Sequence, residues 1–203
     1  MISEATSKAI EIAPEDVDRA VLYGFVARML QAAPTGAELD VLRSIDADDT
    51  EIGRGLAVLS QVARETTSDV LQRNYQDIFI GVGRGELIPY ASYYLTGFLH
   101  EKPLADLRAT MSRFGMERAE GVSEPEDHIA AILQMMEGLI LGSFGQPATL
   151  DEQKQFFASH IGPWASHFFK DLAASQTCAF YSAVGSLGGA LIAVEADAFD
   201  MTR

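Results

Sequence analysis

Apolar residues that recur every three or four positions constrain the fold of this chain more than any other feature of its sequence. In the clearest case a proline and two acids, Pro14-Glu15-Asp16, precede such a series. A proline and acids favour the first turn of a helix, and the period places the apolar side chains on one helical face. This series consists of Val17, Val21, Leu22, Phe25, Val26 and Met29. We therefore expect a helix that begins at Pro14.

Similar patterns predict further helices along the rest of the chain, and no segment alternates like strands joined by hairpin turns. The predicted helices lie near 37–44, 51–64, 68–80, 91–98, 101–114, 126–142, 149–173 and 176–195. We expect an all-α fold, a single-domain helical bundle of about eight to ten helices.

The length and composition suit one domain. The chain has 203 residues, of which 48% are hydrophobic, and this is enough for one sizeable core. We expect a loose N-terminal tail over residues 1–13 and an all-helical domain over 14–203. Glycines at 81, 83 and 85 and a proline at 89 predict a connecting loop near 81–89, a possible hinge. The loop lacks the spacing and the lysine of a phosphate-binding loop.

The net charge of −14 limits the classes of partner. Residues 1–100 carry 8 basic and 15 acidic groups and the remainder carries 7 and 14, so the acidity is spread along the chain. Nucleic acid is therefore excluded as an expected partner, because its phosphates would be repelled. Basic peptides would be attracted, in a manner sensitive to salt.

The sequence also predicts a soluble cytoplasmic protein without stable membrane insertion. Cys178 is the one cysteine, so no internal disulfide can form. The N-terminus lacks the basic start and apolar core of a signal peptide. The longest apolar run, residues 183–194, contains three glycines and is too short to span a bilayer.

The segment Glu124-Pro125-Glu126-Asp127-His128-Ile129 places carboxylates and an imidazole directly ahead of an apolar run. Ser123 and Glu126 have the spacing of a capping box, and acids are favoured at a helix start. One interpretation is thus a capped helix that begins near 126. The other is a ligand site at the end of that helix.

Two more segments precede it, Tyr75-x-x-x-Phe79 ahead of a glycine loop and Pro89-Tyr90-Ala91-Ser92. In this order the three segments resemble those of redox-enzyme maturation chaperones of the TorD/DmsD type, and the resemblance covers residues 15–190. It implies an all-helical cytoplasmic chaperone that binds the twin-arginine signal peptide of a molybdoenzyme catalytic subunit. Such a chaperone assists cofactor insertion and folding before export and holds no cofactor itself. It is a monomer or a domain-swapped dimer.

The resemblance puts Asp127 and His128 in the peptide site. Glu124 and Glu126 join them, because carboxylates accept strong, often bidentate hydrogen bonds from guanidinium groups. The further candidates are aromatic residues, which offer apolar surface with a polar tip. They are Tyr23, Tyr75, Phe79, Tyr90 and Tyr93. Tyr75 and Phe79, like Tyr90 and Tyr94, are four apart and line either a helix interface or a peptide groove.

Two alternatives remain open at this point. The client is a molybdoenzyme that is not exported, or the chain is a helical enzyme or small-molecule binder that uses Glu126, Asp127 and His128. Adjacent helical residues diverge by about 100°, so Asp127 and His128 are poorly placed to bond each other. His160 and His167 are seven apart, too far for a helical metal pair. We therefore expect no catalytic residues and no metal.

Overall fold

The computed structural model describes residues 12–118, 121 and 123–201. The expected N-terminal tail over 1–13 lies outside the described residues, apart from Ile12 and Ala13. Within the described part there are ten α-helices, two π-helical segments and no strand, which confirms the all-α fold. The elements are α1 Pro14–Gln31, α2 Gly36–Arg43, α3 Glu51–Arg64, α4 Ser68–Tyr75, η1 Gln76–Ile80, α5 Ala91–Thr96, α6 Lys102–Phe114, α7 Ile129–Leu141, α8 Leu150–Phe156, η2 Phe157–Ile161, α9 Ala165–Ala174 and α10 Ala179–Met201.

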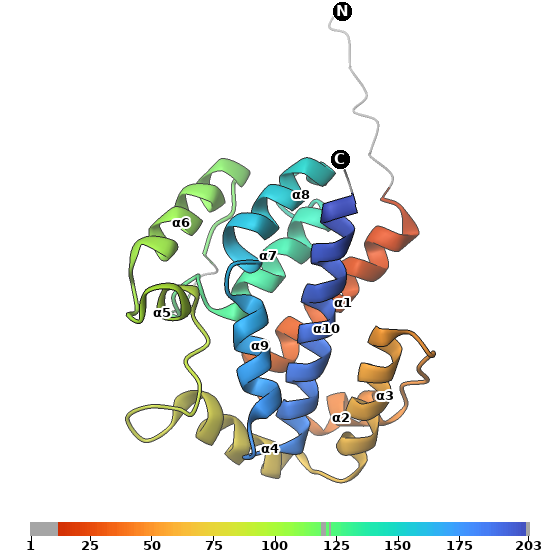
Figure 1. The fold of residues 1–203 in the computed structure, drawn as a ribbon. Coiled ribbons are helices and arrows are strands. Elements are labelled where there is room, and N and C mark those ends of the chain that lie inside the picture. Colours follow the sequence, from red (N-terminus) through yellow and green to blue (C-terminus); the bar gives the residue numbers. More distant parts are fainter. Residues whose placement is uncertain (1–11, 119–120, 122, 202–203) are drawn as a thin grey trace, which may run out of the picture.

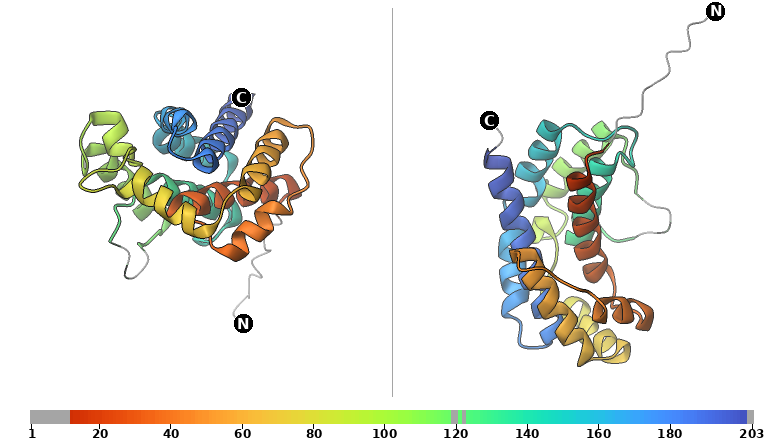
Figure 2. Two further views of the ribbon diagram at one scale, coloured as in Figure 1. Left: turned by 90° about the horizontal axis from the view of Figure 1, so that it is seen from below. Right: turned by 90° about the vertical axis from the view of Figure 1, so that its right-hand side faces the viewer.

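The helices form two layers around one core (Figures 1 and 2). In the first layer α10 lies beside α9 and also packs on α3, and in the second α1 packs along α7. Large, fully buried side chains such as Trp164, Phe168 and Phe169 fill the core between the layers. Helix α6 and the short α5 lie at one edge, next to the start of α7. That edge carries the candidate site.

Small residues let α9 and α10 approach closely. A Cβ atom at Gly185 would collide with the backbone of Ala173, and one at Gly188 would collide with the ring of Phe169. Of the described helices, α10 is the one long and apolar enough to cross a membrane by length and composition, and 56% of its most apolar window is buried. Helix α10 extends beyond the apolar run 183–194 at both ends. Because more than half of its most apolar window is buried inside the protein, it serves as a core helix.

A partly buried ion pair joins the two layers. The guanidinium of Arg19 in α1 donates from Nε and Nη2 to both carboxylate oxygens of Glu195 in α10, at 2.8 and 2.7 Å. The hydroxyl of Tyr23 also donates to Glu195, at 3.0 Å. Tyr23 is fully buried, so it lies in this interface and not on a ligand-accessible surface.

Two predicted helices are interrupted in the structure. The helix predicted over 68–80 widens into a π-helical turn at Gln76, where Gly81 N–H bonds to the Gln76 carbonyl at 2.6 Å. The helix predicted over 149–173 is divided into α8, η2 and α9. Pro163 follows η2, and a proline without an N–H cannot extend the helical ladder. After η1, the loop folds back, and Leu87 N–H bonds to the Ile78 carbonyl at 2.8 Å.

Candidate functional site

Two extended segments meet at the start of α7. Ala91 N–H bonds to the Asp127 carbonyl at 2.9 Å, and Ile129 N–H bonds to the Pro89 carbonyl at 2.8 Å, with Tyr90 opposite His128 in an isolated bridge. The pairing brings together two of the three segments that carried the resemblance. It also holds His128 in an extended conformation directly ahead of Ile129, so a helix cannot begin near 126.

The predicted capping box of Ser123 and Glu126 is therefore wrong. Helix α7 begins at Ile129, and its N-cap is His128. The Nδ1 atom of His128 accepts a hydrogen bond from Ala130 N–H at 3.1 Å. Pro125 lies in the preceding turn, where its carbonyl accepts from His128 N–H at 3.2 Å.

Asp127 is fully buried below this turn. Its Oδ2 atom accepts a hydrogen bond from Ser92 N–H at 2.9 Å, and Ser92 is the second residue of α5. The carboxylate thus caps α5 from outside that helix, with its negative charge at the helix N-terminus. Among the described residues, Asp127 Oδ1 and the Ser92 hydroxyl have no hydrogen-bond partner. Asp127 is consequently placed to position the segment, and it is not among the residues that line the pocket described below.

His128 is a neutral imidazole at neutral pH. Burial lowers its pKa to about 4, against the opposing charges of Glu124 and Asp127. Because Nδ1 accepts from Ala130, we assign the proton to Nε2. The Tyr90 ring packs edge-on against the imidazole, with the two centroids 5.2 Å apart.

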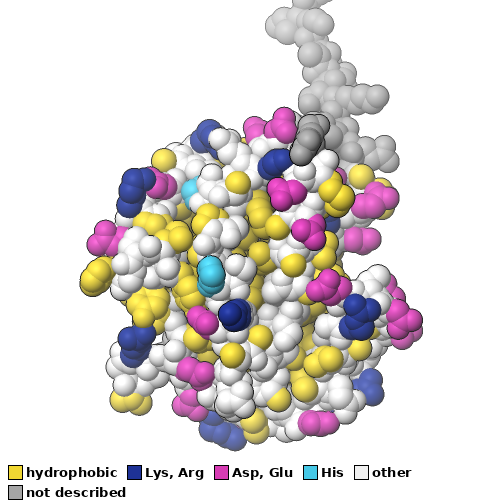
Figure 3. Space-filling model, viewed as in Figure 1, with side chains coloured by type: hydrophobic (Ala, Val, Ile, Leu, Met, Phe, Trp, Pro, Cys, Tyr) yellow, Lys and Arg dark blue, Asp and Glu magenta, His cyan; other side chains and the backbone are white. Residues whose placement is uncertain are grey.

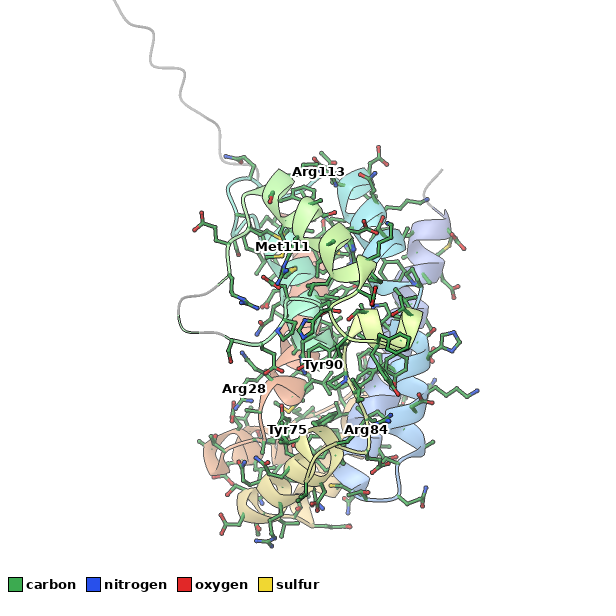
Figure 4. The ribbon with its side chains drawn as sticks, turned by 90° about the vertical axis from the view of Figure 1, so that its left-hand side faces the viewer. Arg28, Tyr75, Arg84, Tyr90, Met111 and Arg113 are labelled. Carbon is green, nitrogen blue, oxygen red and sulfur yellow. The ribbon has the colours of Figure 1, made fainter. Side chains whose placement is uncertain are left out.

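A pocket of about 380 Å³ opens beside these residues, between α1, α6, α7 and the segment before α7. Its walls come from Gln31, Tyr75, Met111, Met116, Glu117, Arg118, Glu124, Pro125, Glu126, His128, Ala130, Ala131, Gln134, Met135 and Phe144. Figure 4 looks onto this face, where Met111, Tyr90 and Tyr75 follow one another down the molecule. Flexible methionines and an aromatic ring give the pocket an adaptable apolar wall.

Carboxylates form one rim of the pocket. Glu124 accepts a short hydrogen bond from the Tyr90 hydroxyl. Glu126 accepts two bonds from Arg108, at 3.1 and 2.8 Å, and lies 3.5 Å from the Nε of Arg118. Burial would raise the pKa of Glu126, but the bonds and charges of these arginines outweigh it and lower that pKa. The Glu126 carboxylate is therefore ionised at neutral pH.

Tyr75 and Phe79 play different parts at the floor. The Tyr75 hydroxyl donates to the Gln31 carbonyl at 2.9 Å, and its ring lines the pocket. Burial, assisted by the charge of Glu124, raises the Tyr75 pKa to about 12. Phe79 is buried behind Tyr75, with ring centroids 5.0 Å apart, and supports it from the core against Tyr181.

The other aromatic candidates are not all brought together. Tyr90 and Tyr94 do not share a helical face, because Tyr90 is the extended N-cap of α5. Tyr94 turns into the core against Trp164, and Tyr93 lies under Arg84, 5.4 Å from its guanidinium. Tyr23 lies between α1 and α10, outside the pocket lining.

Sequence reasoning missed the methionine wall and several polar pocket residues. Met111 and Met116 stand on either side of the end of α6, and Met135 lies at the middle of α7. Methionines close to the acidic segment were the available signal, since such residues favour adaptable binding surfaces. Gln31, Gln134 and Arg118 carry no comparable pattern. Within the described residues no group of three or more His, Cys, Asp and Glu is arranged to hold a metal ion.

A family model described as nitrate reductase delta subunit matches residues 45–170, more than half of the chain. The chain belongs to this family, that of the TorD-like chaperones for molybdoenzyme maturation. The matched range contains η1, the paired segments at 89–92 and 127–130, and most of the pocket.

Full-length relatives agree with this assignment. The chain is 27% identical over 192 residues to the chaperone protein TorD of Vibrio atlanticus, covering 83% of this chain and 88% of that one. It is 25% identical over 198 residues to the chaperone protein TorD of Aliivibrio fischeri, covering 87% and 92%. A crystal structure titled as a putative redox enzyme maturation protein from Archaeoglobus fulgidus shares the fold, with a TM-score of 0.53, 17% identity and coverage of 96% and 99%.

Proposed function

We propose that the pocket between α1, α6 and α7 binds the twin-arginine signal peptide of a molybdoenzyme catalytic subunit. In this proposal the protein acts in the cytoplasm, where it assists cofactor insertion and folding before the client is exported. The single observation that carries the proposal is the position of two acidic side chains, Glu124 and Glu126, beside an apolar pocket wall.

The two halves of the pocket fit the two halves of such a peptide. A guanidinium group presents planar donors that match a carboxylate, so the arginines belong at the acidic rim. The apolar stretch that follows them belongs against Met111, Met116 and Met135, whose flexible side chains adapt to different sequences. The methionine wall can therefore accept apolar segments of different sequence, while the acidic rim recognises the arginines.

The charge of the whole molecule supports the same ligand. Acidic side chains are spread over the visible face in Figure 3, in keeping with the net charge of −14. Such a field attracts a basic peptide at a distance, and salt screens it.

The enzymatic alternative has less support from the geometry. Asp127 is fully buried and binds Ser92 N–H, and the Nδ1 atom of His128 is occupied by Ala130 N–H. Neither group is therefore set to exchange protons with a ligand in the pocket through those atoms. The relatives, moreover, are named chaperones.

Titration of the purified protein tests the proposal. The ligand is a synthetic peptide with two adjacent arginines followed by an apolar segment, and the matched control carries two lysines instead. We expect preference for arginine, weaker binding at high salt, and a loss of roughly 10-fold to 150-fold in Glu126→Gln, since a hydrogen bond to a charged group is worth roughly 1.5–3 kcal/mol.

Glu65→Gln removes the same charge from α3, outside the pocket lining, and should bind as wild type. Equal affinity for the arginine and lysine peptides would favour a client without twin arginines. No binding of either peptide would refute the proposal.

The oligomeric state belongs to the proposal as well. We propose a monomer or a domain-swapped dimer that exchanges segments about the 81–89 loop. In the described chain the loop is held to η1 by the bonds of Glu86 and Leu87 N–H to the Asp77 and Ile78 carbonyls. Light scattering at several concentrations measures the two species directly.

A further inference from the structure

We propose that Arg118 is a built-in competitor of the ligand: it holds the place at Glu126 that an arginine of the bound peptide takes. The inference rests on the proposed function and adds a regulatory contact to the same pocket. Entry of the peptide then requires the Arg118 side chain to leave Glu126.

The contacts divide the carboxylate of Glu126 between two arginines. Arg108 donates from Nε and Nη2 to Oε2, at 3.1 and 2.8 Å. Arg118 faces the other oxygen, Oε1, from 3.5 Å, and its Nη2 donates to the Glu124 carbonyl at 2.6 Å. Arg118 lines the pocket and Arg108 does not. Arg118 thus occupies the position that a ligand arginine would take, and Arg108 holds the carboxylate from the side away from the pocket.

The Arg118 contact is the weaker of the two. A charge-assisted hydrogen bond is normally about 2.7–2.9 Å long, so 3.5 Å from Nε to Oε1 is a loose ion pair. The Arg118 side chain is 37% exposed, whereas that of Glu126 is 12% exposed. Exposed ion pairs are weak, which makes Arg118 replaceable by a better-placed guanidinium.

This arrangement also contributes to specificity. When no ligand is bound, Arg118 partly neutralises the negative charge of the rim. A single cation that enters the pocket therefore gains little electrostatic free energy. A ligand arginine restores a planar, bidentate partner to the carboxylate, while a lysine offers a single point charge. Displacing Arg118 costs the same free energy for both peptides, and the arginine peptide offsets that cost better because its contact with the carboxylate is stronger.

The test compares Arg118→Gln with Arg113→Gln. Both variants make the net charge one unit more negative, but Arg113, in the last turn of α6 (Figure 4), lies outside the pocket lining and donates to Gln155 instead. The probe is the synthetic twin-arginine peptide, titrated by calorimetry. We expect Arg118→Gln to bind roughly twofold to fivefold more tightly than Arg113→Gln, from the strength of an exposed ion pair.

A double variant checks that Arg118 acts through Glu126. In Glu126→Gln the carboxylate is absent, so adding Arg118→Gln should bring no gain. Circular dichroism melts of every variant confirm that each is folded.

The inference is overturned if Arg118→Gln binds no more tightly than Arg113→Gln, or if its gain persists beside Glu126→Gln. In either case arginine-specific binding by wild type leaves the proposed function standing. If neither wild type nor Arg118→Gln binds the peptide, the proposed function fails and this inference fails with it.

Discussion

The carboxylate of Asp127 accepts a hydrogen bond from the backbone N–H of Ser92, 35 residues earlier in the chain and 2.9 Å away. Neither residue is exposed. The bond joins the start of α5 to the segment that leads into α7, and so it sets the position of Glu124, Glu126 and His128 at the pocket. The buried acid of this segment thus supports the site from below.

Replacement of Asp127 by alanine should lower the free energy of unfolding by about 2 kcal/mol, because a buried N–H loses its acceptor and α5 loses its cap. Urea denaturation measures this. Unchanged stability with lost peptide binding would instead show that Asp127 contacts the ligand.

Removal of Glu195 should destabilise the protein more severely. Glu195→Ala leaves the buried Tyr23 hydroxyl without its acceptor and Arg19 with only Asp16 and Gln153, so we expect a loss of about 2–3 kcal/mol. Tyr23→Phe is the matched control, which removes one hydrogen bond at about 1 kcal/mol. Similar losses in the two variants would contradict the interpretation of Glu195 as the link between the layers.

Stability should fall as the pH drops from 6.5 toward 4. Burial lowers the His128 pKa to about 4 in the folded protein, whereas an unfolded histidine takes up a proton near 6.5. The unfolded state therefore binds more protons than the folded state in this range. Proton binding stabilises the unfolded state and lowers the free energy of unfolding, by on the order of 3 kcal/mol at most. Above pH 6.5 the imidazole is neutral in both states and contributes no slope.

The variant His128→Asn tests the assignment, because asparagine is also a good N-cap. Its unfolding free energy should depend less on pH between 6.5 and 4 than that of wild type. Part of the dependence should remain, since burial also lowers the pKa of His160. An unaltered slope would show that His128 does not titrate in this way.

Two glycines of α10 should respond in opposite directions to substitution by alanine. At Gly185 a Cβ atom collides with the Ala173 backbone, so Gly185→Ala should destabilise by about 1–3 kcal/mol. At Gly189 the nearest atom, the Cβ of Phe169, is 3.9 Å away, so Gly189→Ala should stabilise by about 0.5–1 kcal/mol. Thermal melts compare the two, and equal shifts would contradict the packing.

The helices could largely be predicted from sequence, because each buries one face and the period of that face is local information. Long-range contacts defeated the prediction at particular residues. Helix α7 starts at Ile129 and not at 126, because residues 127–129 pair with residues 89–91. Helix-capping rules consider only residues that are close in the sequence, so they could not predict this pairing. From the sequence, Tyr94 and Tyr23 could not be distinguished from aromatic residues that line the pocket. Tertiary packing places Tyr23 in the core and Tyr94 against Trp164.

The site was predicted in part for the same reason. The acidic segment and Tyr75 stand at the pocket, as their chemistry indicated. Arg118 was missed because its effect depends on proximity to Glu126.

Photo-crosslinking with a twin-arginine peptide tests the central claim most directly. A diazirine placed in the apolar segment of the peptide labels whatever it touches, and mass spectrometry locates the label. We predict labels at Met111, Met116 or Met135 that disappear in excess unlabelled arginine peptide and persist in excess lysine peptide. Labels confined to the apolar groove between α1, α3 and α10, at Val21 or Leu56, would contradict the account.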